Sequence, residues 1–212
     1  MKYKDLAITD YIEQAASASA TPGGGSVSAL IAALGAALGQ MVYNLTVTKK
    51  SYQANDESVK TAVQSDWRAI EKLQGEFLDL IDRDIDAFNL YMDALALPKE
   101  TDDEKAARKE ALAKASIIAM EVPLETSGKA LELLRHLGSI ARYGHKNCIS
   151  DAGVAALSAH AALQASVMNV RINLGGIDDQ AIREQAEKTC AAYIEESAVL
   201  TKEIIDIVYA MI

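Results

Sequence analysis

Residues 21–45 read TPGGGSVSALIAALGAALGQMVYNL, and this stretch decides the fold. Three glycines and a serine lead into about six helical turns of apolar and small residues. Bulky residues at spacings of four and three predict a packing seam, and a stripe of small residues runs beside it. The seam comprises Val27, Ile31, Leu34, Leu38, Met41 and Leu45, and the stripe comprises Ser28, Ala32, Gly35 and Gly39. We therefore expect a helix with two buried faces and neighbours on several sides.

The same region raises the question of a membrane span. Residues 14–48 contain no Asp, Glu, Lys or Arg, and a run of that length could cross a bilayer. However, Gln40, Tyr43, Asn44 and many alanines dilute it, and the mean hydropathy of the chain is near zero. We expect no membrane span and interpret the segment as the buried centre of a helical protein.

Composition limits the class of protein. The 212 residues are 50% hydrophobic and include only three prolines, which favours one mostly helical domain over residues 1–212. A net charge of −9 argues against nucleic acid or an anionic membrane as partner. Cys148 and Cys190 form no CxxC pair, and the N-terminus lacks the pattern of a signal peptide. We expect reduced thiols and a cytoplasmic protein.

Periodicity and punctuation predict an all-α, single-domain bundle of about six helices with long central helices. Thr101-Asp-Asp-Glu104 is a capping box, Pro123 should kink or break its helix, and Ser150 and Asp178 should begin the last two helices. The expected helices cover residues 5–19, 23–48, 57–97, 101–144, 150–174 and 178–212.

One carboxylate interrupts an apolar seam in the long third helix. Positions from Val63 to Leu95 follow strict 4-3 spacing, and Asp84 is the single acid among them. A buried unpaired Asp costs several kcal/mol or loses its charge. Asp84 therefore either bonds a neighbouring helix, faces a cavity or has a functional role.

Two further segments could bind a ligand. Gly23, Gly24, Gly25 and Ser26 open a helix with bare backbone N–H groups, which suits an anion or polar group. The pattern is neither a P-loop nor a dinucleotide fingerprint, and by itself it favours a tight turn between packed helices. Residues 142–151 gather hydrogen-bond donors at a helix junction. This junction is either simply polar or a binding site for a heterocycle or carboxylates. Its polar residues include Arg142, His145, Lys146, Asn147, Ser150 and Asp151.

Asn169 and Asn173 stand at positions i and i+4 and should share one helix face. Amides are mediocre helix formers, so a hydrogen-bonding task is expected for both. The three histidines show no metal-ligand spacing, and we expect no metal site.

The chain resembles a known family, the cyclodeaminase/cyclohydrolase family. That family includes the C-terminal half of formiminotransferase–cyclodeaminase and stand-alone bacterial methenyltetrahydrofolate cyclohydrolases. The glycine block and DRDIDAFNLYMDALALPKET (82–101) carry the resemblance. Shorter matches are VPL (122–124), SD (150–151) and MNVRINL (168–174), in the family's order. One departure is His145, where the family pattern has Asn after the glycine.

The resemblance implies an all-α fold, at least a homodimer, a reduced folate as substrate and no required cofactor. It places the catalytic carboxylate at Asp84, with Asp82 as the alternative, and the folate pocket at the glycine loop and the Asn/Ser/Asp junction. Basic residues must meet the anionic glutamate of folate, and the candidates are Lys49, Lys50, Lys99, Arg142 and Lys146.

Two reactions fit the resemblance. A cyclohydrolase adds water to 5,10-methenyltetrahydrofolate to give 10-formyltetrahydrofolate, whereas a cyclodeaminase converts 5-formiminotetrahydrofolate into the methenyl form and ammonia. The sequence shows no formiminotransferase half, which slightly favours the cyclohydrolase. The opposing class is a helical oligomeric scaffold in which the glycines and Asp84 serve packing alone.

Overall fold

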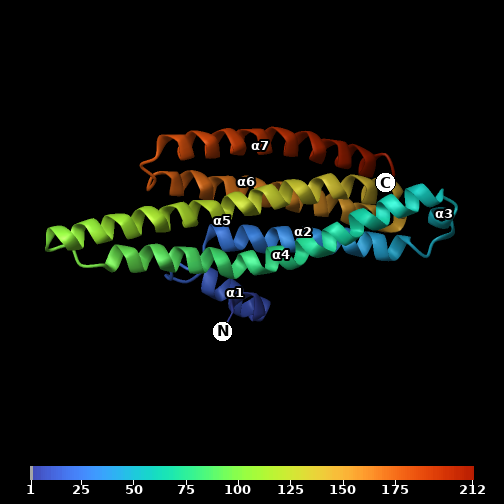
Figure 1. Ribbon diagram of the computed structural model, residues 1–212. Helices are drawn as coiled ribbons and strands as arrows, with labels where there is room; N and C mark the ends of the chain where they lie inside the picture. Colours follow the sequence, from blue (N-terminus) through green and yellow to red (C-terminus); the bar gives the residue numbers. More distant parts are fainter. Residues whose placement is uncertain (1) are drawn as a thin grey trace.

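A computed structural model describes residues 2–212, and over that range all regular secondary structure is helical, without a β-strand (Figure 1). The all-α prediction is confirmed. Short 3-10 turns at Tyr3–Asp5 and Lys146–Cys148 accompany the α-helices. The α-helices are α1 (Ile8–Ala15), α2 (Gly24–Thr46), α3 (Lys50–Gln53), α4 (Glu57–Ala96), α5 (Asp102–Tyr143), α6 (Ile149–Leu174) and α7 (Gln180–Tyr209).

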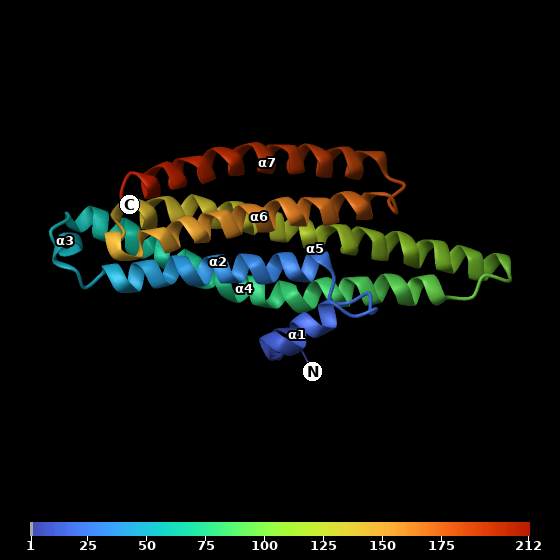
Figure 2. The same cartoon turned by 180° about the vertical axis from the view of Figure 1, so that it is seen from behind.

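Four helices form the central bundle. Helix α2 packs against α4 and α6, and α5 packs against the same two from the other side. Helix α7 covers α5 and α6, while α1 lies outside the bundle on the side of α2 and α4 (Figures 1 and 2). The far ends of α4 and α5 extend past the other helices as a hairpin (Figure 1). Side chains such as Phe77, Leu134 and Leu163 are fully buried in the core between these helices.

The small-residue stripe of α2 explains how tightly the bundle closes. A Cβ atom on Gly39 would lie 2.6 Å from Leu137 Cδ2, and one on Gly35 would lie 3.0 Å from the Ala155 carbonyl oxygen. A larger residue at either position would force Leu137 or the backbone of α6 to shift, so both glycines allow α5 and α6 to approach α2 closely. The stripe is therefore buried, as predicted.

The bulky seam of α2, in contrast, is only partly buried within the chain. Val27, Ile31 and Leu38 are half-buried and pack against the core, whereas Leu34 is 54% exposed and Met41 and Leu45 are exposed as well. The prediction of a second buried face is wrong at these last three positions, because α4, α5 and α6 all lie on the inner sides of α2 and no helix of the described chain covers its outer side. Helix α2 is long and apolar enough to cross a membrane, but more than half of its most apolar window is buried in the bundle.

Several predicted helix boundaries need correction. The first helix is shorter than expected, and the one-turn helix α3 was not predicted. Ser150 does not cap α6, because the helix begins one residue earlier, after Cys148, and Ser150 is exposed in its first turn. Asp179 rather than Asp178 caps α7, since its carboxylate accepts from the backbone N–H groups of Ala181 and Ile182.

The two predictions for α5 have different outcomes. The capping box is present, with Thr101 Oγ1 accepting from Glu104 N at 3.2 Å and Glu104 Oε2 accepting from Thr101 N at 2.8 Å. Pro123, however, does not break the helix, which continues without interruption from Asp102 to Tyr143. An asparagine side chain of α6 donates a hydrogen bond to the helix carbonyl that Pro123 leaves without a partner, and this contact lies beside the candidate site.

Candidate active site

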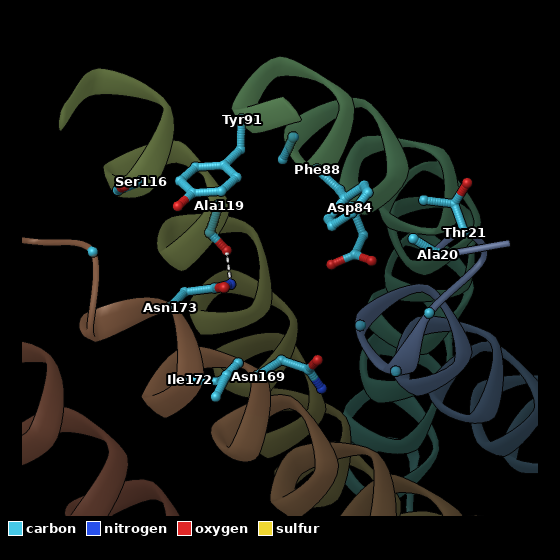
Figure 3. Close-up of a pocket in the computed structure, with 15 residues that line it drawn as sticks. Ala20, Thr21, Asp84, Phe88, Tyr91, Ser116, Ala119, Asn169, Ile172 and Asn173 are labelled. Carbon is cyan, nitrogen blue, oxygen red and sulfur yellow. Dashed lines mark hydrogen bonds between the residues drawn. The ribbon is translucent and has the colours of Figure 1, made fainter. Parts of the chain in front are cut away.

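A cavity of about 380 Å³ opens where the N-terminus of α2 meets α4, α5 and α6 (Figure 3). Helix α4 contributes an acid and two aromatic rings, α5 contributes small residues, and the last turns of α6 contribute two amides. The lining comprises Ala20, Thr21, Gly23, Gly24, Gly25, Asp84, Ala87, Phe88, Tyr91, Ser116, Ala119, Asn169, Ile172, Asn173 and Gly176. The glycine loop, Asp84 and both asparagines, separated in sequence by up to 150 residues, thus share one cavity.

The glycine loop holds the carboxylate of Asp84. Ser26 N, in the first turn of α2, donates to Asp84 Oδ2 at 2.8 Å. A Cβ atom on Gly25 would lie only 1.9 Å from Asp84 Oδ1, so any side chain there would displace the acid. The loop is therefore a tight packing turn, and part of its capacity for an anion is used by the protein's own carboxylate. Substrate binding by the loop stays a prediction.

A hydrogen bond to helix α1 holds the side chain of Ser26 in place. Its hydroxyl is 2.8 Å from the Tyr11 hydroxyl, and both side chains are buried. Burial raises the pKa of Tyr11 above its ordinary value, so the phenol is neutral near pH 7. Tyr11 is the buried residue of α1, and the contact anchors this helix to the start of α2. A hydrogen-bonded chain therefore runs from Tyr11 through Ser26 to Asp84.

Asn173 explains why Pro123 leaves α5 intact. Proline has no backbone N–H, so the carbonyl of Ala119, four residues earlier, loses its helical partner. Asn173 Nδ2 donates to this carbonyl at 2.6 Å, as the dashed line in Figure 3 shows. The bond satisfies the oxygen and joins α6 to α5 beside the cavity.

Asn169 lies one turn earlier on the same face of α6, as the i, i+4 spacing predicts. Its side-chain nitrogen donates to the Ala165 carbonyl at 2.8 Å within the helix. A Cβ atom on Gly24 would lie 3.2 Å from the Asn169 amide, so the backbone of the glycine loop passes close to it. Its side-chain oxygen is thus placed at the cavity between the loop and Asn173 (Figure 3).

The charge in the cavity is unusual. Asp84 is the only charged side chain among the described residues that line it, so no Lys, Arg or His there neutralises the acid. Burial raises the pKa of Asp84 above its ordinary value, and the Ser26 N–H bond opposes part of that rise. An isolated carboxylate in such a setting can accept a proton or stabilise a cation beside it.

Asp82, the alternative catalytic residue, lies elsewhere. It does not line the cavity, and its Oδ1 accepts from the backbone N–H of Tyr3 at 2.6 Å. Asp82 therefore anchors the N-terminal segment to α4. Of the two predicted acids, only Asp84 reaches the site.

The predicted junction residues lie at the other end of the bundle. Gly24 and Thr46 mark the two ends of α2, which are about 33 Å apart. His145 N donates to Thr46 Oγ1 at 2.8 Å, which fixes the junction at the end remote from the glycines. Lys49 and Lys50 follow α2 at this end, and Arg142, His145 and Lys146 line a separate cavity there. Asn147, Ser150 and Asp151 belong to the same junction.

Within one chain the structure thus does not bring these junction residues to Asp84. Their role in substrate binding stays a prediction. Lys99 is placed differently, since it lies on the α4–α5 hairpin and lines a cavity that shares Gly176 with the Asp84 cavity.

Some lining residues were absent from the predicted set. Phe88 and Tyr91 continue the seam that contains Asp84, so their positions were recognisable although their exposure to a cavity was not. Ser116, Ala119 and Ile172 carry no signal in the sequence that distinguishes them from ordinary helix residues. Among the described residues, no group of three His, Cys, Asp or Glu side chains is arranged to hold a metal ion.

Comparisons with known proteins identify the family of the chain. The family model described as Formiminotransferase-cyclodeaminase matches residues 7–192. Methenyltetrahydrofolate cyclohydrolase of Methylorubrum extorquens is 37% identical, over 95% of both chains. Formimidoyltransferase-cyclodeaminase of Gallus gallus is 34% identical over 84% of this chain, which spans only 32% of that protein. The crystal structure of formiminotetrahydrofolate cyclodeaminase from Thermotoga maritima superposes with a TM-score of 0.85, at 27% identity and 99% and 98% coverage.

Proposed function

The chain belongs to the formiminotransferase-cyclodeaminase family, and from this membership we propose that it is an enzyme acting on the carbon that bridges N5 and N10 of tetrahydrofolate. The favoured activity is that of a methenyltetrahydrofolate cyclohydrolase. A relative of nearly the same length bears that name and matches almost the whole chain. A formiminotetrahydrofolate cyclodeaminase is the second candidate, because the Thermotoga maritima protein with the same fold bears that name.

One observation carries the proposal: a lone carboxylate faces a cavity with aromatic and amide walls. The methenyl substrate is an amidinium cation, and its charge lies at the carbon that water attacks. An ionised Asp84 stabilises that cation electrostatically, since no lining cation competes with it. Phe88 and Tyr91 offer flat apolar surfaces to the substrate rings, and Asn169 and Asn173 lie opposite them.

The proposed reaction uses Asp84 as the base. Water forms a bond to the bridging carbon and gives one proton to Asp84, which produces a neutral carbinol. The carbon–N5 bond then breaks, the hydroxyl proton moves to N5, and the formyl group remains on N10. The proton on Asp84 passes to solvent, so the net products are 10-formyltetrahydrofolate and one proton. The backbone N–H of Ser26 keeps the carboxylate aimed at the cavity throughout.

The cyclodeaminase reaction would use the same acid as a proton shuttle. N10 attacks the carbon of the protonated formimino group and loses its proton to Asp84. The departing NH2 group gains that proton from Asp84 and leaves as ammonia, and the methenyl cation remains. Burial raises the pKa of Asp84, which makes its protonated form more accessible and suits a group that must both accept and donate a proton. Neither reaction calls for a cofactor in this proposal, because each consists of proton transfers and bond changes at one carbon.

An absorbance assay tests the proposal. The purified chain is added to 5,10-methenyltetrahydrofolate near neutral pH, and the near-ultraviolet band of the substrate is followed against the uncatalysed rate. A catalysed loss of the band supports the cyclohydrolase, and ammonia release from 5-formiminotetrahydrofolate supports the cyclodeaminase. Failure of both reactions would leave the helical scaffold as the remaining interpretation.

We also propose that two copies associate through the uncovered sides of α2 and α6. These helices lie next to each other on the side facing the viewer in Figure 2. We call their exposed apolar residues the α2–α6 face; it comprises Leu34, Met41, Leu45, Val154, Leu157, Met168 and Ile172. No Asp, Glu, Lys or Arg occurs in α2 or between Asp151 and Arg171 in α6. A surface of this kind suits an identical, equally uncharged surface.

Other partners are less suitable for the α2–α6 face. A net charge of −9 opposes an anionic membrane or nucleic acid. A cytoplasmic location is proposed as well, and the two free cysteines, Cys148 and Cys190, support it. Light scattering on Leu34→Glu and Leu157→Glu variants tests the homodimer. A dimeric wild type that these variants convert to monomers supports it, and a monomeric wild type contradicts it.

A further inference from the structure

The N-terminal segment, residues 2–22, is joined to the bundle by few contacts. Its helix α1 lies outside the bundle, and both isoleucines of this helix are exposed (Figures 1 and 2). Residues 16–20, which lead from α1 to the glycine loop, are exposed as well. The backbone of Tyr3 fastens the start of the segment to Asp82 of α4. Among the described residues of α1, Tyr11 is the only buried one, so the position of α1 beside the glycine loop depends mainly on this side chain.

Tyr11 forms a buried hydrogen bond with the start of α2. Its hydroxyl lies 2.8 Å from Ser26 Oγ, and neither hydroxyl has another hydrogen-bond partner among residues 2–212. Ser26 is fully buried, and Tyr11 is only 6% exposed. Because a buried hydroxyl without a partner is costly in free energy, each of the two groups holds the other in place.

Ser26 is the first residue of α2 that has a side chain. Three glycines precede it, and the N-cap residue Gly23 makes no side-chain hydrogen bond. Since glycine is the most permissive residue in its backbone conformation, the glycines themselves do not fix the direction of the N–H groups in this first turn. The Ser26 N–H nevertheless donates to Asp84 Oδ2 at 2.8 Å. The contact between Ser26 Oγ and Tyr11 therefore orients the backbone that holds the carboxylate.

We propose that Tyr11 is a positioning residue for the reaction: its hydroxyl fixes the first turn of α2 through Ser26, and this turn keeps Asp84 aimed at the substrate. This inference rests on the proposed folate function. Tyr11 does not line the cavity, so it acts through Ser26 and does not contact the substrate. A base that is less well oriented slows the chemical step more than it weakens substrate binding, so the effect of losing Tyr11 falls on kcat rather than on KM.

The test compares Tyr11→Phe, Ser26→Ala and the double variant. Ser26→Ala keeps the backbone N–H that Asp84 accepts, so each single change removes the same bond between hydroxyls. We expect each to lower kcat by about 3–10-fold and to leave KM within about twofold. The double variant should lose no more than the larger single loss, because the two hydroxyls act as one unit.

The pH profile gives a second readout. The Ser26 N–H opposes the rise that burial causes in the pKa of Asp84, so a looser bond raises this pKa further. The decline of kcat/KM at low pH should therefore begin at a higher pH in all three variants than in the wild type. The position of this decline does not depend on the amount of active enzyme, so partial unfolding does not imitate the shift.

Tyr3→Phe is the matched control, since it removes a hydroxyl from the same segment and keeps the backbone bond to Asp82. This variant should keep the wild-type kcat and pH profile. A wild-type kcat and pH profile in Tyr11→Phe would overturn the positioning role alone. Losses that multiply in the double variant, or an equal loss in Tyr3→Phe, would overturn it as well. A wild type inactive on both 5,10-methenyltetrahydrofolate and 5-formiminotetrahydrofolate would instead refute the proposed folate function.

Discussion

Both ends of the bundle gather polar groups, but the two ends differ in structure. At one end, a carboxylate lies against a glycine loop and faces a cavity with amide and aromatic walls. At the other end, the junction after α5 collects more donors, including Arg142, His145 and Asn147, yet no acid lines its cavity among the described residues. The number of polar residues is thus a poor indicator of an active site. A single polar group at a position where its burial costs free energy is a better one.

The largest expected effect is at Asp84. Asp84→Asn keeps the shape and the Ser26 bond but removes the base, so kcat should fall by about 10²–10⁴-fold. The variant should fold normally, because a neutral amide costs less to bury than a carboxylate. Circular dichroism and the methenyltetrahydrofolate assay check both statements. Asp82→Asn is the matched control, and a greater loss there would move the catalytic role to Asp82.

The next effect is at Gly25. A methyl group in Gly25→Ala would lie within 2 Å of the Asp84 carboxylate, so the acid must leave its position. We expect kcat to fall by about 10–100-fold through misplacement of the base. Gly75→Ala is the control, since a Cβ there meets nothing within 4 Å. That variant should keep full activity and gain about 0.5–1 kcal/mol of stability, because alanine favours a helix interior.

A smaller effect is expected at Asn173. Asn173→Ala leaves the Ala119 carbonyl without a partner, and the free energy of unfolding should fall by about 1–3 kcal/mol. Pro123→Ala restores the backbone N–H, so the double variant should be less destabilised than the two single variants suggest. Urea denaturation measures the coupling. Simple additivity would mean that the Asn173–Ala119 bond does not compensate for Pro123.

The smallest effect is expected at the remote junction. If a single chain forms the whole site, His145→Asn, which restores the family pattern, and Lys49→Gln/Lys50→Gln should each change kcat/KM by less than about twofold, since the two ends of α2 are about 33 Å apart. Steady-state kinetics on both variants decides this point. A tenfold loss would show that a second copy brings its junction to the Asp84 cavity.

Much of the molecule could be predicted from local sequence. The long helices, the capping box at Thr101 and the face shared by Asn169 and Asn173 follow from periodicity and short-range hydrogen bonds. The bulky seam of α2 was misjudged, because periodicity shows that a face is apolar and does not show which molecule covers it.

The composition of the site was only partly predictable. Asp84 was recognisable as a charge in an apolar seam, but its contact with Ser26 joins residues 58 positions apart. The bond from Asn173 to Ala119 depends likewise on how α5 and α6 pack. Local sequence patterns do not predict either contact. For the same reason, they could not show that the junction at residues 142–151 lies far from the Asp84 cavity.

The pH dependence of kcat/KM tests the role of Asp84 most directly. The base must be ionised, and burial raises its pKa above the ordinary value of 3.8. The rate constant should therefore fall as the pH decreases through an apparent pKa above 3.8, and the residual activity of Asp84→Asn should lack that decline. A wild-type profile that stays flat down to pH 3.8, or the same decline in Asp84→Asn, would contradict a catalytic role for this carboxylate.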